Sequence, residues 1–251
     1  MMNGRKHHHV LITGGAGGIG EALARCFLTE GHRVVIVDRR ADALERIQQQ
    51  LPAIQTTVLD ITDTAALQDL ASKLGPCPDG PDVLINNAGI HGSVPLIAPN
   101  YDVADQLRDI DSEIRTNFTA LAQNCALWRP YLQDRAGGAA IVNIASALAF
   151  VPKYSSATYC ASKAAVHQFS LSLALQLAHT RIRVVTVYPP MVATHMTAGR
   201  DRPTTMPADR FAHLFYRAFI NGKRTIRIGD SRWLYWLHRL SPALAARWIE
   251  P

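Results

Sequence analysis

The chain lacks several features that would place it outside the globular proteins. No stretch of 18 apolar residues is free of charge, so a membrane-spanning helix is not expected. The four cysteines show no CxxC spacing, and reduced thiols are therefore expected. Glycine and proline together make up about 12% of the 251 residues, which excludes collagen-like and disordered classes.

Positive charge is in modest excess, with a net charge of +6, yet lysine and arginine are scattered rather than clustered with aromatic residues. This pattern favours a mildly basic soluble enzyme, with no nucleic-acid partner. The basic N-terminus precedes an apolar run of only Val10–Ile12, too short for a secretory signal, so a cytoplasmic location is expected. The histidines at 7–9 are interpreted as a solvated edge before a first strand, and no metal site is predicted.

Short β-branched runs alternate with longer helical patterns along the chain. The strands are predicted at 9–13, 33–38, 55–60, 82–86, 139–144, 182–187 and 225–228, and the helices at 18–30, 41–51, 62–74, 103–135, 158–179 and 208–221. Strands that are unbroken apolar runs are typical of a parallel sheet covered on both faces. The alternation therefore predicts a doubly wound α/β sheet in a single domain over residues 1–251.

A glycine-rich turn, TGGAGGIG at 13–20, joins the first predicted strand to the first helix. Glycines let the backbone approach a phosphate, and the helix start offers free N–H groups to a pyrophosphate. Gly15, Gly17 and Gly20 fit the spacing GxGxxG, whereas Gly14, Gly18 and Gly20 fit TGxxxGxG after Thr13. The turn alone does not decide between the spacings, but its position predicts a dinucleotide site.

Acidic residues close the second and third predicted strands. Asp38 follows Gly18 by 20 residues and can accept hydrogen bonds from an adenosine ribose while repelling a 2′-phosphate. Arg39 and Arg40 follow and could instead attract that phosphate, so NAD is the preferred cofactor and NADP the alternative. Helix capping is another interpretation of Asp38.

Two further strand ends carry candidate cofactor contacts. Asp60 can reach an adenine amino group and Ile61 can pack on its ring, although capping of the next helix by Thr62 explains this segment equally well. The string NNAG at 86–89 follows the fourth strand, where small residues suit a ligand crevice. A plain Asn-rich turn is the alternative for that string.

Tyr159 and Lys163 lie four residues apart and so share one face of a predicted helix. An ammonium beside a phenol lowers the tyrosine pKa from about 10, which makes the tyrosine usable as an acid or base near neutrality. Ser146 follows the fifth strand at the carboxyl edge of the sheet. The three residues together favour a catalytic group over an ordinary half-buried aromatic.

Taken together, these motifs resemble those of the short-chain dehydrogenase/reductase family. The matching strings run in family order over about residues 9 to 195: TGGAGGIG at 13–20, LDIT at 59–62, NNAG at 86–89, RTNF around Asn117, NIASA around Ser146 and YCASK at 159–163. The resemblance favours the TGxxxGxG spacing and implies a Rossmann-like sheet of about seven strands in the order 3-2-1-4-5-6-7. It also implies an oxidoreductase that uses NAD or NADP on a secondary alcohol or ketone, as a homodimer or homotetramer.

The resemblance also implies roles for individual residues. Tyr159 would be the general acid/base, Lys163 would lower its pKa and hold the nicotinamide ribose, Ser146 would bind the substrate oxygen, and Asn117 would carry a water that relays protons. The implied cofactor-binding residues are Gly14, Gly17, Gly18, Ile19, Gly20, Asp38, Arg39, Asp60, Ile61, Asn87, Ala88, Gly89, Tyr159, Lys163, Pro189, Val192 and Thr194.

The chain departs from the family where Pro189 and Pro190 stand in place of the common Pro-Gly. Proline has a fixed φ and no N–H, so any glycine-specific conformation or amide contact at position 190 is lost. Thr194 still stands where the family binds the nicotinamide carboxamide. The proline pair, ALAFVP at 147–152 and YCASKAAVH at 159–167 resemble a subgroup called DltE-like, a likeness that defines no substrate.

Substrate choice is expected from loops at the carboxyl edge of the sheet. His91–Asp102 is predicted to form one wall and His195–Pro207 a lid, with Arg200 and Arg202 interpreted as solvated lid charges rather than contacts to an acidic substrate.

The C-terminal segment 232–251 holds three of the four tryptophans, and Trp233, Trp236, Leu237 and Leu240 share one helical face. The segment is expected to pack over the substrate pocket or a neighbouring subunit, with ordinary core or membrane-surface contact as alternatives. Two other functions stay open: a non-catalytic dinucleotide sensor, which would usually lack the Tyr or Lys retained here, and a membrane-peripheral protein of the same fold.

Overall fold

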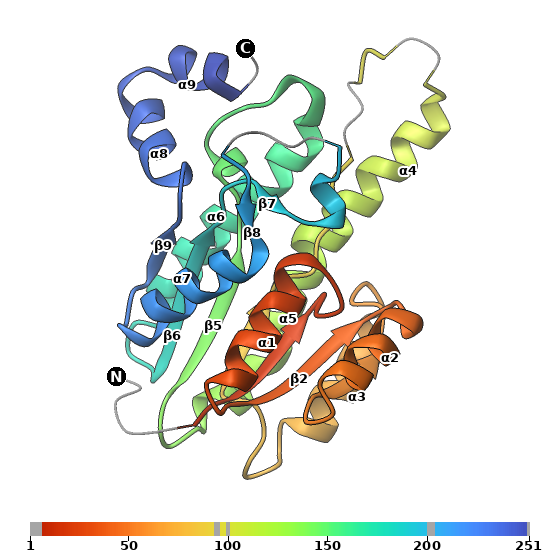
Figure 1. Ribbon diagram of the computed structural model, residues 1–251, viewed down its shortest axis with the longest axis vertical. Helices are drawn as coiled ribbons and strands as arrows, with labels where there is room; N and C mark the ends of the chain where they lie inside the picture. The colour runs from red at the N-terminus through yellow and green to blue at the C-terminus, as the bar shows by residue number, and fades with distance from the viewer. Residues whose placement is uncertain (1–6, 93–95, 99–100, 200–203, 250–251) are drawn as a thin grey trace.

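A single parallel sheet organises the chain. The computed structural model describes residues 7–92, 96–98, 101–199 and 204–249 (Figure 1). Within these residues, parallel strands pair in the order β3-β2-β1-β4-β5-β6-β9. They are β1 (His9–Thr13), β2 (Arg33–Asp38), β3 (Gln55–Val58), β4 (Val83–Asn86), β5 (Ala139–Ile144), β6 (Ile182–Tyr188) and β9 (Thr225–Arg227). The predicted doubly wound sheet is confirmed, and its seventh strand is β9 because β7 (Val192–Ala193) and β8 (Met206–Pro207) form a separate ribbon.

Helices cover both faces of the sheet. One face carries α1 (Gly18–Thr29), α2 (Ala41–Gln50) and α7 (Ala208–Ile220), and the other carries α3 (Thr64–Leu74), α5 (Ala120–Gln133) and α6 (Ala157–Gln176). The helix α4 (Val103–Ile114) precedes α5, and α8 (Ser231–Leu240) and α9 (Pro242–Ile249) follow the last strand. Short 3-10 turns are η2 (Ala147–Ala149), η3 (Tyr154–Ser156) and η4 (His195–Thr197).

Alternation along β1 divides the core between the two faces. Val10 and Ile12 belong to the cluster with Phe27 on the α1 side, whereas Leu11 belongs to the cluster with Trp128 on the α5 side. All five side chains are fully buried. Burying a large apolar side chain contributes about 1.5–3 kcal/mol, so β1 is an apolar run because both of its faces are covered.

The order of the strands places a crevice beside β1. In the sheet, β2 and β3 lie on one side of β1, and β4, β5, β6 and β9 lie on the other. At such a switch point the loops at the carboxyl ends of the strands diverge and leave room for a ligand. The glycine turn after β1, Asp38 in β2, the NNAG string after β4 and Ser146 after β5 all lie at these ends.

Most helix ends lie within a few residues of the prediction, but two differences have a clear structural cause. The single helix predicted over 103–135 is interrupted by η1 (Arg115–Thr119), a π-helical turn that lies between α4 and α5. Capping of α3 by Thr62 is wrong: Asp63 is the N-cap, and its carboxylate accepts a hydrogen bond from the Ala66 N–H. Thr62 instead donates its N–H and its hydroxyl to Asp60.

The predicted solvated edge at histidines 7–9 is wrong for His8 and His9, whereas His7 is exposed. His8 and His9 are only 5% and 7% exposed. The ring of His8 stacks on that of His32 at 5.3 Å, and the Nδ1 atom of His9 lies 2.6 Å from the Asp79 carbonyl oxygen. The sequence prediction failed for these two rings because His32, just before β2, and the loop before β4 pack against them.

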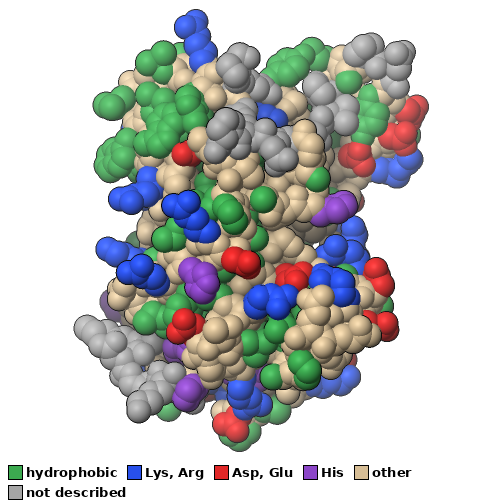
Figure 2. All heavy atoms as spheres, viewed as in Figure 1, with side chains coloured by type: hydrophobic (Ala, Val, Ile, Leu, Met, Phe, Trp, Pro, Cys, Tyr) green, Lys and Arg blue, Asp and Glu red, His purple; other side chains and the backbone are tan. Residues whose placement is uncertain are grey.

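The C-terminal helices pack on η2 through a side that the sequence did not single out. Leu234, Ala245 and Ile249 are buried against Ala147 and Val151. The ordinary-core interpretation is wrong for Trp236 and Leu240, whose exposed fractions are 64% and 85%. Figure 2 shows hydrophobic side chains gathered at the surface where Figure 1 places α8 and α9. Among the described residues, no helix combines the length and the hydropathy needed to cross a bilayer.

Candidate active site

A cleft of about 560 Å³ opens at the carboxyl ends of the central strands. It brings together all of the predicted site residues except Gly20 and Asn117, which do not line it. The predicted residues along its wall are Gly14, Gly17, Gly18, Ile19, Asp38, Arg39, Asp60, Ile61, Asn87, Ala88, Gly89, Ser146, Tyr159, Lys163, Pro189, Val192 and Thr194. One cavity therefore joins the candidate cofactor segments to the candidate catalytic residues.

The glycine turn is held against the end of β4. Gly14 and Gly18 have φ values of +63° and +51°, a left-handed conformation that glycine adopts without strain. A Cβ on Gly20 would lie 2.1 Å from the Gly14 carbonyl oxygen, so no side chain fits there. The side chain of Asn87 donates to the carbonyls of Thr13 and Gly14. Gly20 thus shapes the turn from behind the cleft wall.

The start of α1 has no side-chain cap. Its N-cap is Gly17, whereas α3 and α4 are capped by the carboxylates of Asp63 and Asp102. Gly18 and Ile19, the first two residues of α1, therefore have no side-chain cap on their N–H groups, and both line the cleft at the positive end of the helix dipole. Such an end suits a phosphate group.

Asp38 is buried at the end of β2 and makes four hydrogen bonds. Its carboxylate accepts from the Ala16 N–H at 3.1 Å and from the backbone and guanidinium of Arg40 at 3.0–3.2 Å. Burial alone would raise the pKa of Asp38, but the bonds from Arg40 and Ala16 outweigh it and lower the pKa. Arg40, which the predicted list of cofactor contacts omitted, lines the cleft and folds over Gly17.

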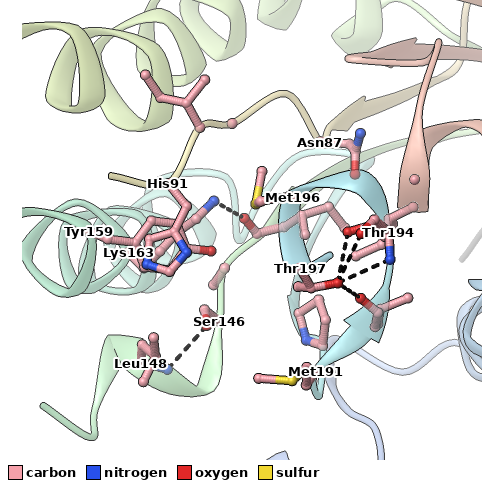
Figure 3. A pocket seen from close by; sticks show the side chains of 18 of the residues that line it. Asn87, His91, Ser146, Leu148, Tyr159, Lys163, Met191, Thr194, Met196 and Thr197 are labelled. Carbon is pink, nitrogen blue, oxygen red and sulfur yellow. Dashed lines mark hydrogen bonds between the residues drawn. The ribbon is translucent and has the colours of Figure 1, made fainter. Parts of the chain in front are cut away.

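Tyr159 and Lys163 share one face of α6 at the cleft. The Nζ atom of Lys163 lies 5.7 Å from the centre of the Tyr159 ring and donates to the Ile144 carbonyl at 3.0 Å. Lys163 is 4% exposed, and burial lowers the pKa of its ammonium to about 8. The centre of the His91 ring lies 4.2 Å from that of Tyr159. Figure 3 shows these two side chains together at the cleft.

Ser146 lies where β5 ends and η2 begins. Its hydroxyl accepts a hydrogen bond from the Leu148 N–H at 3.1 Å and so caps this short turn (Figure 3). The cap fixes the side chain at the carboxyl edge of the sheet, where it lines the same cleft as Tyr159. Because a hydroxyl can accept and donate at once, its proton stays available for a ligand oxygen.

Asn117 lies in the π-helical turn and is completely buried. Its side-chain oxygen accepts from the Ile90 N–H, and its amide donates to the Ile90 carbonyl and to the Ser162 hydroxyl. Both amide hydrogens are thus used within the protein. The side chain clamps the loop after β4, and its oxygen keeps acceptor capacity for a water.

The segment after β6 closes one side of the cleft. Thr194 forms a reciprocal capping box with Thr197 in η4, and its methyl group would touch a Cβ placed on Gly18 at 2.8 Å. The predicted lid begins at η4 and ends in β8, while Arg200 and Arg202 lie outside the described residues. Pro190, the departure noted in the sequence, lines the cleft.

Several residues of the far wall of the cleft were not predicted individually from the sequence. His91 and Met196 belong to the two predicted substrate loops, and Leu234, Trp248 and Ile249 come from the C-terminal segment. Trp248 was not assigned to the helical face predicted for Trp233 and Trp236. The aromatic content of the C-terminal segment indicated that it helps to form this wall. Which of its residues face the cleft could not be predicted, because that depends on the turn between α8 and α9.

Comparison with known proteins agrees with this geometry. The family described as short chain dehydrogenase matches residues 8–204. An uncharacterized oxidoreductase of Bacillus subtilis, DltE, is 36% identical over 225 residues, which cover 86% of each chain. A short-chain dehydrogenase from Sphingobium yanoikuyae in complex with NADPH is 28% identical, with a TM-score of 0.77 and 95% of each chain covered. A short-chain dehydrogenase/reductase from Burkholderia phymatum in complex with NAD is 22% identical, with a TM-score of 0.80 over 94% of this chain and 95% of that chain.

The fold and the cleft define a dinucleotide-binding oxidoreductase. The chain belongs to the short-chain dehydrogenase/reductase family, whose members act on CH–OH donors with NAD or NADP as acceptor. The predicted class of enzyme and the predicted likeness to DltE are confirmed.

Proposed function

We propose that the enzyme transfers a hydride between a nicotinamide dinucleotide and a secondary alcohol or its ketone, with Tyr159 as the general acid/base. The observation that carries this proposal is the buried ammonium of Lys163 one helical turn from Tyr159, at the same cleft as the glycine turn. An ammonium in a poorly solvated site attracts a phenolate more strongly than it would in water.

The residues present fit a nicotinamide dinucleotide. The uncapped start of α1 would bind the pyrophosphate, Asp38 the adenosine ribose, and Asp60 with Ile61 the adenine. Asn87–Gly89, Lys163 and the segment Pro189–Thr194 would hold the nicotinamide half. When bound, the cofactor supplies or accepts the hydride.

The protein's own residues manage the substrate proton. In alcohol oxidation the Tyr159 phenolate removes the hydroxyl proton, and in ketone reduction the Tyr159 hydroxyl returns it. Ser146 donates a hydrogen bond to the substrate oxygen and so orients the reacting carbon. Asn117 holds the loop after β4 in place, and its side-chain oxygen binds the water that relays protons to solvent.

NAD is the proposed cofactor in preference to NADP. The Ala16 N–H holds the Asp38 carboxylate at the end of β2, where the proposal puts the adenosine ribose, and a carboxylate there would repel a 2′-phosphate. Arg40 competes for this carboxylate, but its own side chain is 50% exposed, so solvent screens the guanidinium and stabilises it when it swings away. A ribose can therefore displace it.

The cofactor preference is tested by calorimetric titration with NADH and NADPH. We expect NADH to bind at least tenfold more tightly, a difference of about 1.4 kcal/mol. Asp38→Asn should narrow that ratio and Arg40→Ala should widen it, because the first removes the negative charge and the second removes its counter-charge. Tighter binding of NADPH to the unaltered protein would contradict the assignment of Asp38. A panel of alcohols and ketones, followed at the nicotinamide absorbance, then tests the reaction itself.

We also propose that the enzyme is a cytoplasmic homodimer or homotetramer, as its reduced cysteines and its family suggest. Light scattering after gel filtration measures the assembly. A second candidate property is contact with a membrane surface, favoured by the exposed Trp233, Trp236 and Leu240 beside Arg232 and Arg239. Co-sedimentation with anionic liposomes, with and without residues 232–251, tests it: equal sedimentation of both forms would reject that contact.

A further inference from the structure

Glu113 is a buried carboxyl group that the proposed mechanism leaves unused. It lies at the end of α4, one helical turn before Asn117, and is 4% exposed. The other buried carboxyls in the described part of the chain have basic neighbours, since Asp38 pairs with Arg40 and Asp82 lies 3.3 Å from His8. Glu113 has no basic group within ion-pair distance among the described residues.

Lys163 is a buried basic group that likewise lacks an ion-pair partner among the described residues. Its ammonium donates to the Ile144 carbonyl, and no carboxylate in the described ranges lies within ion-pair distance of it. An unpaired buried charge is strongly unfavourable. Burial lowers the pKa of Lys163 to about 8, and the charge of Glu113 opposes this fall. Burial likewise raises the pKa of Glu113, and the charge of Lys163 opposes that rise.

The loop after β4 connects the two groups. A Cβ on Gly89 would lie 3.5 Å from the Lys163 Nζ atom and 3.1 Å from the Asn117 side-chain oxygen. Three residues further on, the Gly92 N–H donates to the Glu113 carboxylate at 2.8 Å. The loop thus runs past Lys163, Asn117 and Glu113, and the helices α4 and α6 that carry these side chains pack on each other.

The other ionisable groups around this pair are identifiable in the described residues. Asp109, one turn earlier on α4, faces Glu113 and raises its pKa. Tyr101 donates a hydrogen bond to Asp109, and both line a cavity of about 30 Å³ on the outer side of Glu113. A cavity of that size holds a water, through which Glu113 can exchange its proton. On the inner side, the ionisable groups are Tyr159, whose ring centre lies 5.7 Å from the Lys163 Nζ atom, and His91, whose ring centre lies 4.2 Å from that of Tyr159.

We propose that Glu113 is the counter-charge of Lys163: its carboxylate keeps Lys163 an ammonium inside the site and thereby sets the pH range in which Tyr159 exchanges protons. Glu113 does not line the main cleft, so it is a positioning residue that acts through Lys163. The effect on turnover rests on the function proposed above, whereas the charge state of Lys163 does not depend on it.

The first test measures the Lys163 pKa without turnover. Protein labelled with ¹³C-lysine is titrated by NMR, and the Lys163 signal is assigned by its loss in Lys163→Met. Glu113→Gln keeps the size of the side chain and its bond to the Gly92 N–H but removes the charge. We expect it to lower the Lys163 pKa by about one unit, a tenfold change in the protonation equilibrium. Glu113→Asp should keep a value closer to that of the unaltered protein.

The control is Asp111→Asn, which removes an exposed carboxylate from the same helix and should leave the Lys163 pKa unchanged. The reciprocal measurement protects the test against misfolding of the glutamine variant: in Lys163→Met the pKa of the Glu113 carboxyl should rise. An unchanged Lys163 pKa in folded Glu113→Gln, or an unchanged Glu113 pKa in Lys163→Met, would overturn the proposal.

The second test is the pH profile of kcat for alcohol oxidation at saturating cofactor. In Glu113→Gln the acid limb should move up by about one pH unit, while cofactor affinity and the unfolding temperature stay unchanged. An equal loss of kcat at every pH would indicate a purely structural role and refute the proposal. If the unaltered protein oxidises no alcohol, the proposed function fails, and the NMR titration still decides the role of Glu113.

Discussion

Replacing Lys163 by Met removes the charge on which the proposed acid/base chemistry depends. The ammonium lies 5.7 Å from the centre of the Tyr159 ring. At that distance, and with an effective dielectric constant of about 20, two unit charges interact by about 3 kcal/mol. This energy corresponds to a pKa change of about two units. The Tyr159 pKa should therefore rise by about two units in Lys163→Met, and alcohol oxidation on the acid limb should fall about 100-fold.

The assay is the pH profile of kcat at saturating cofactor, since loss of a ribose contact would otherwise raise the KM for the cofactor and mix two effects. Lys153→Met is the matched control, because Lys153 lines the same cleft but is not on the helical face of Tyr159. Its acid limb should not move. An acid limb at the same pH in Lys163→Met and in the unaltered enzyme would refute the electrostatic reasoning.

Three further outcomes follow from the geometry. Gly20→Ala should lower dinucleotide affinity at least tenfold in a fluorescence titration, because its Cβ would lie 2.1 Å from the Gly14 carbonyl oxygen; unchanged affinity would contradict the tight packing of the turn. Trp248→Ala should raise the KM of the alcohol and leave the Kd of NADH unchanged, because Trp248 lines the far wall of the cleft; a changed Kd alone would contradict this placement. Burial lowers the pKa of His32 from 6.5 to about 4, so the unfolded state binds the proton first, and the free energy of unfolding should fall by about 3 kcal/mol as the pH falls from about 6.5 to 4. In His32→Gln, denaturant unfolding should show a smaller fall in this free energy over the same pH range. An equal fall would contradict the assignment.

The sheet was predictable because its strands are buried on both faces. In β1, successive apolar side chains pack into the hydrophobic cores on opposite faces of the sheet. A strand covered on both faces therefore appears in the sequence as a short unbroken apolar run, which can be recognised without knowing its partners. The glycine turn was predictable for a similar reason, since a left-handed φ at Gly14 and the contact behind Gly20 exclude other residues.

Features that depend on distant partners were not predictable. The burial of His8 requires His32, which lies on another segment of the chain. Arg40 folds over Gly17 because its guanidinium donates to the Asp38 carboxylate. The sequence does not show whether Arg40 binds a ribose, a phosphate or this carboxylate. The π-helical turn at Asn117 interrupts a helical pattern that reads as continuous, because the clamp on the loop after β4 stabilises it.

In the C-terminal segment, the buried side of the helices was also not predictable from the sequence. The tryptophans at helical spacing suggested one apolar side, but the turn at Ser241 divides the segment into two short helices. Leu234 and Trp248 then line the cleft while Trp236 stays exposed. Side-chain spacing within one helix could not predict this division, because the packing partners come from the other helix and from η2.

The most direct measurement of the central claim is turnover by Tyr159→Phe with NADH binding measured on the same sample. The variant removes one hydroxyl oxygen, so binding should stay within a factor of about two while kcat falls about 10²- to 10⁴-fold. Tyr154→Phe is the control, since Tyr154 is 65% exposed and has Thr158, not a lysine, four residues further on. Full activity of Tyr159→Phe would contradict the assignment of Tyr159 as the proton-transferring group.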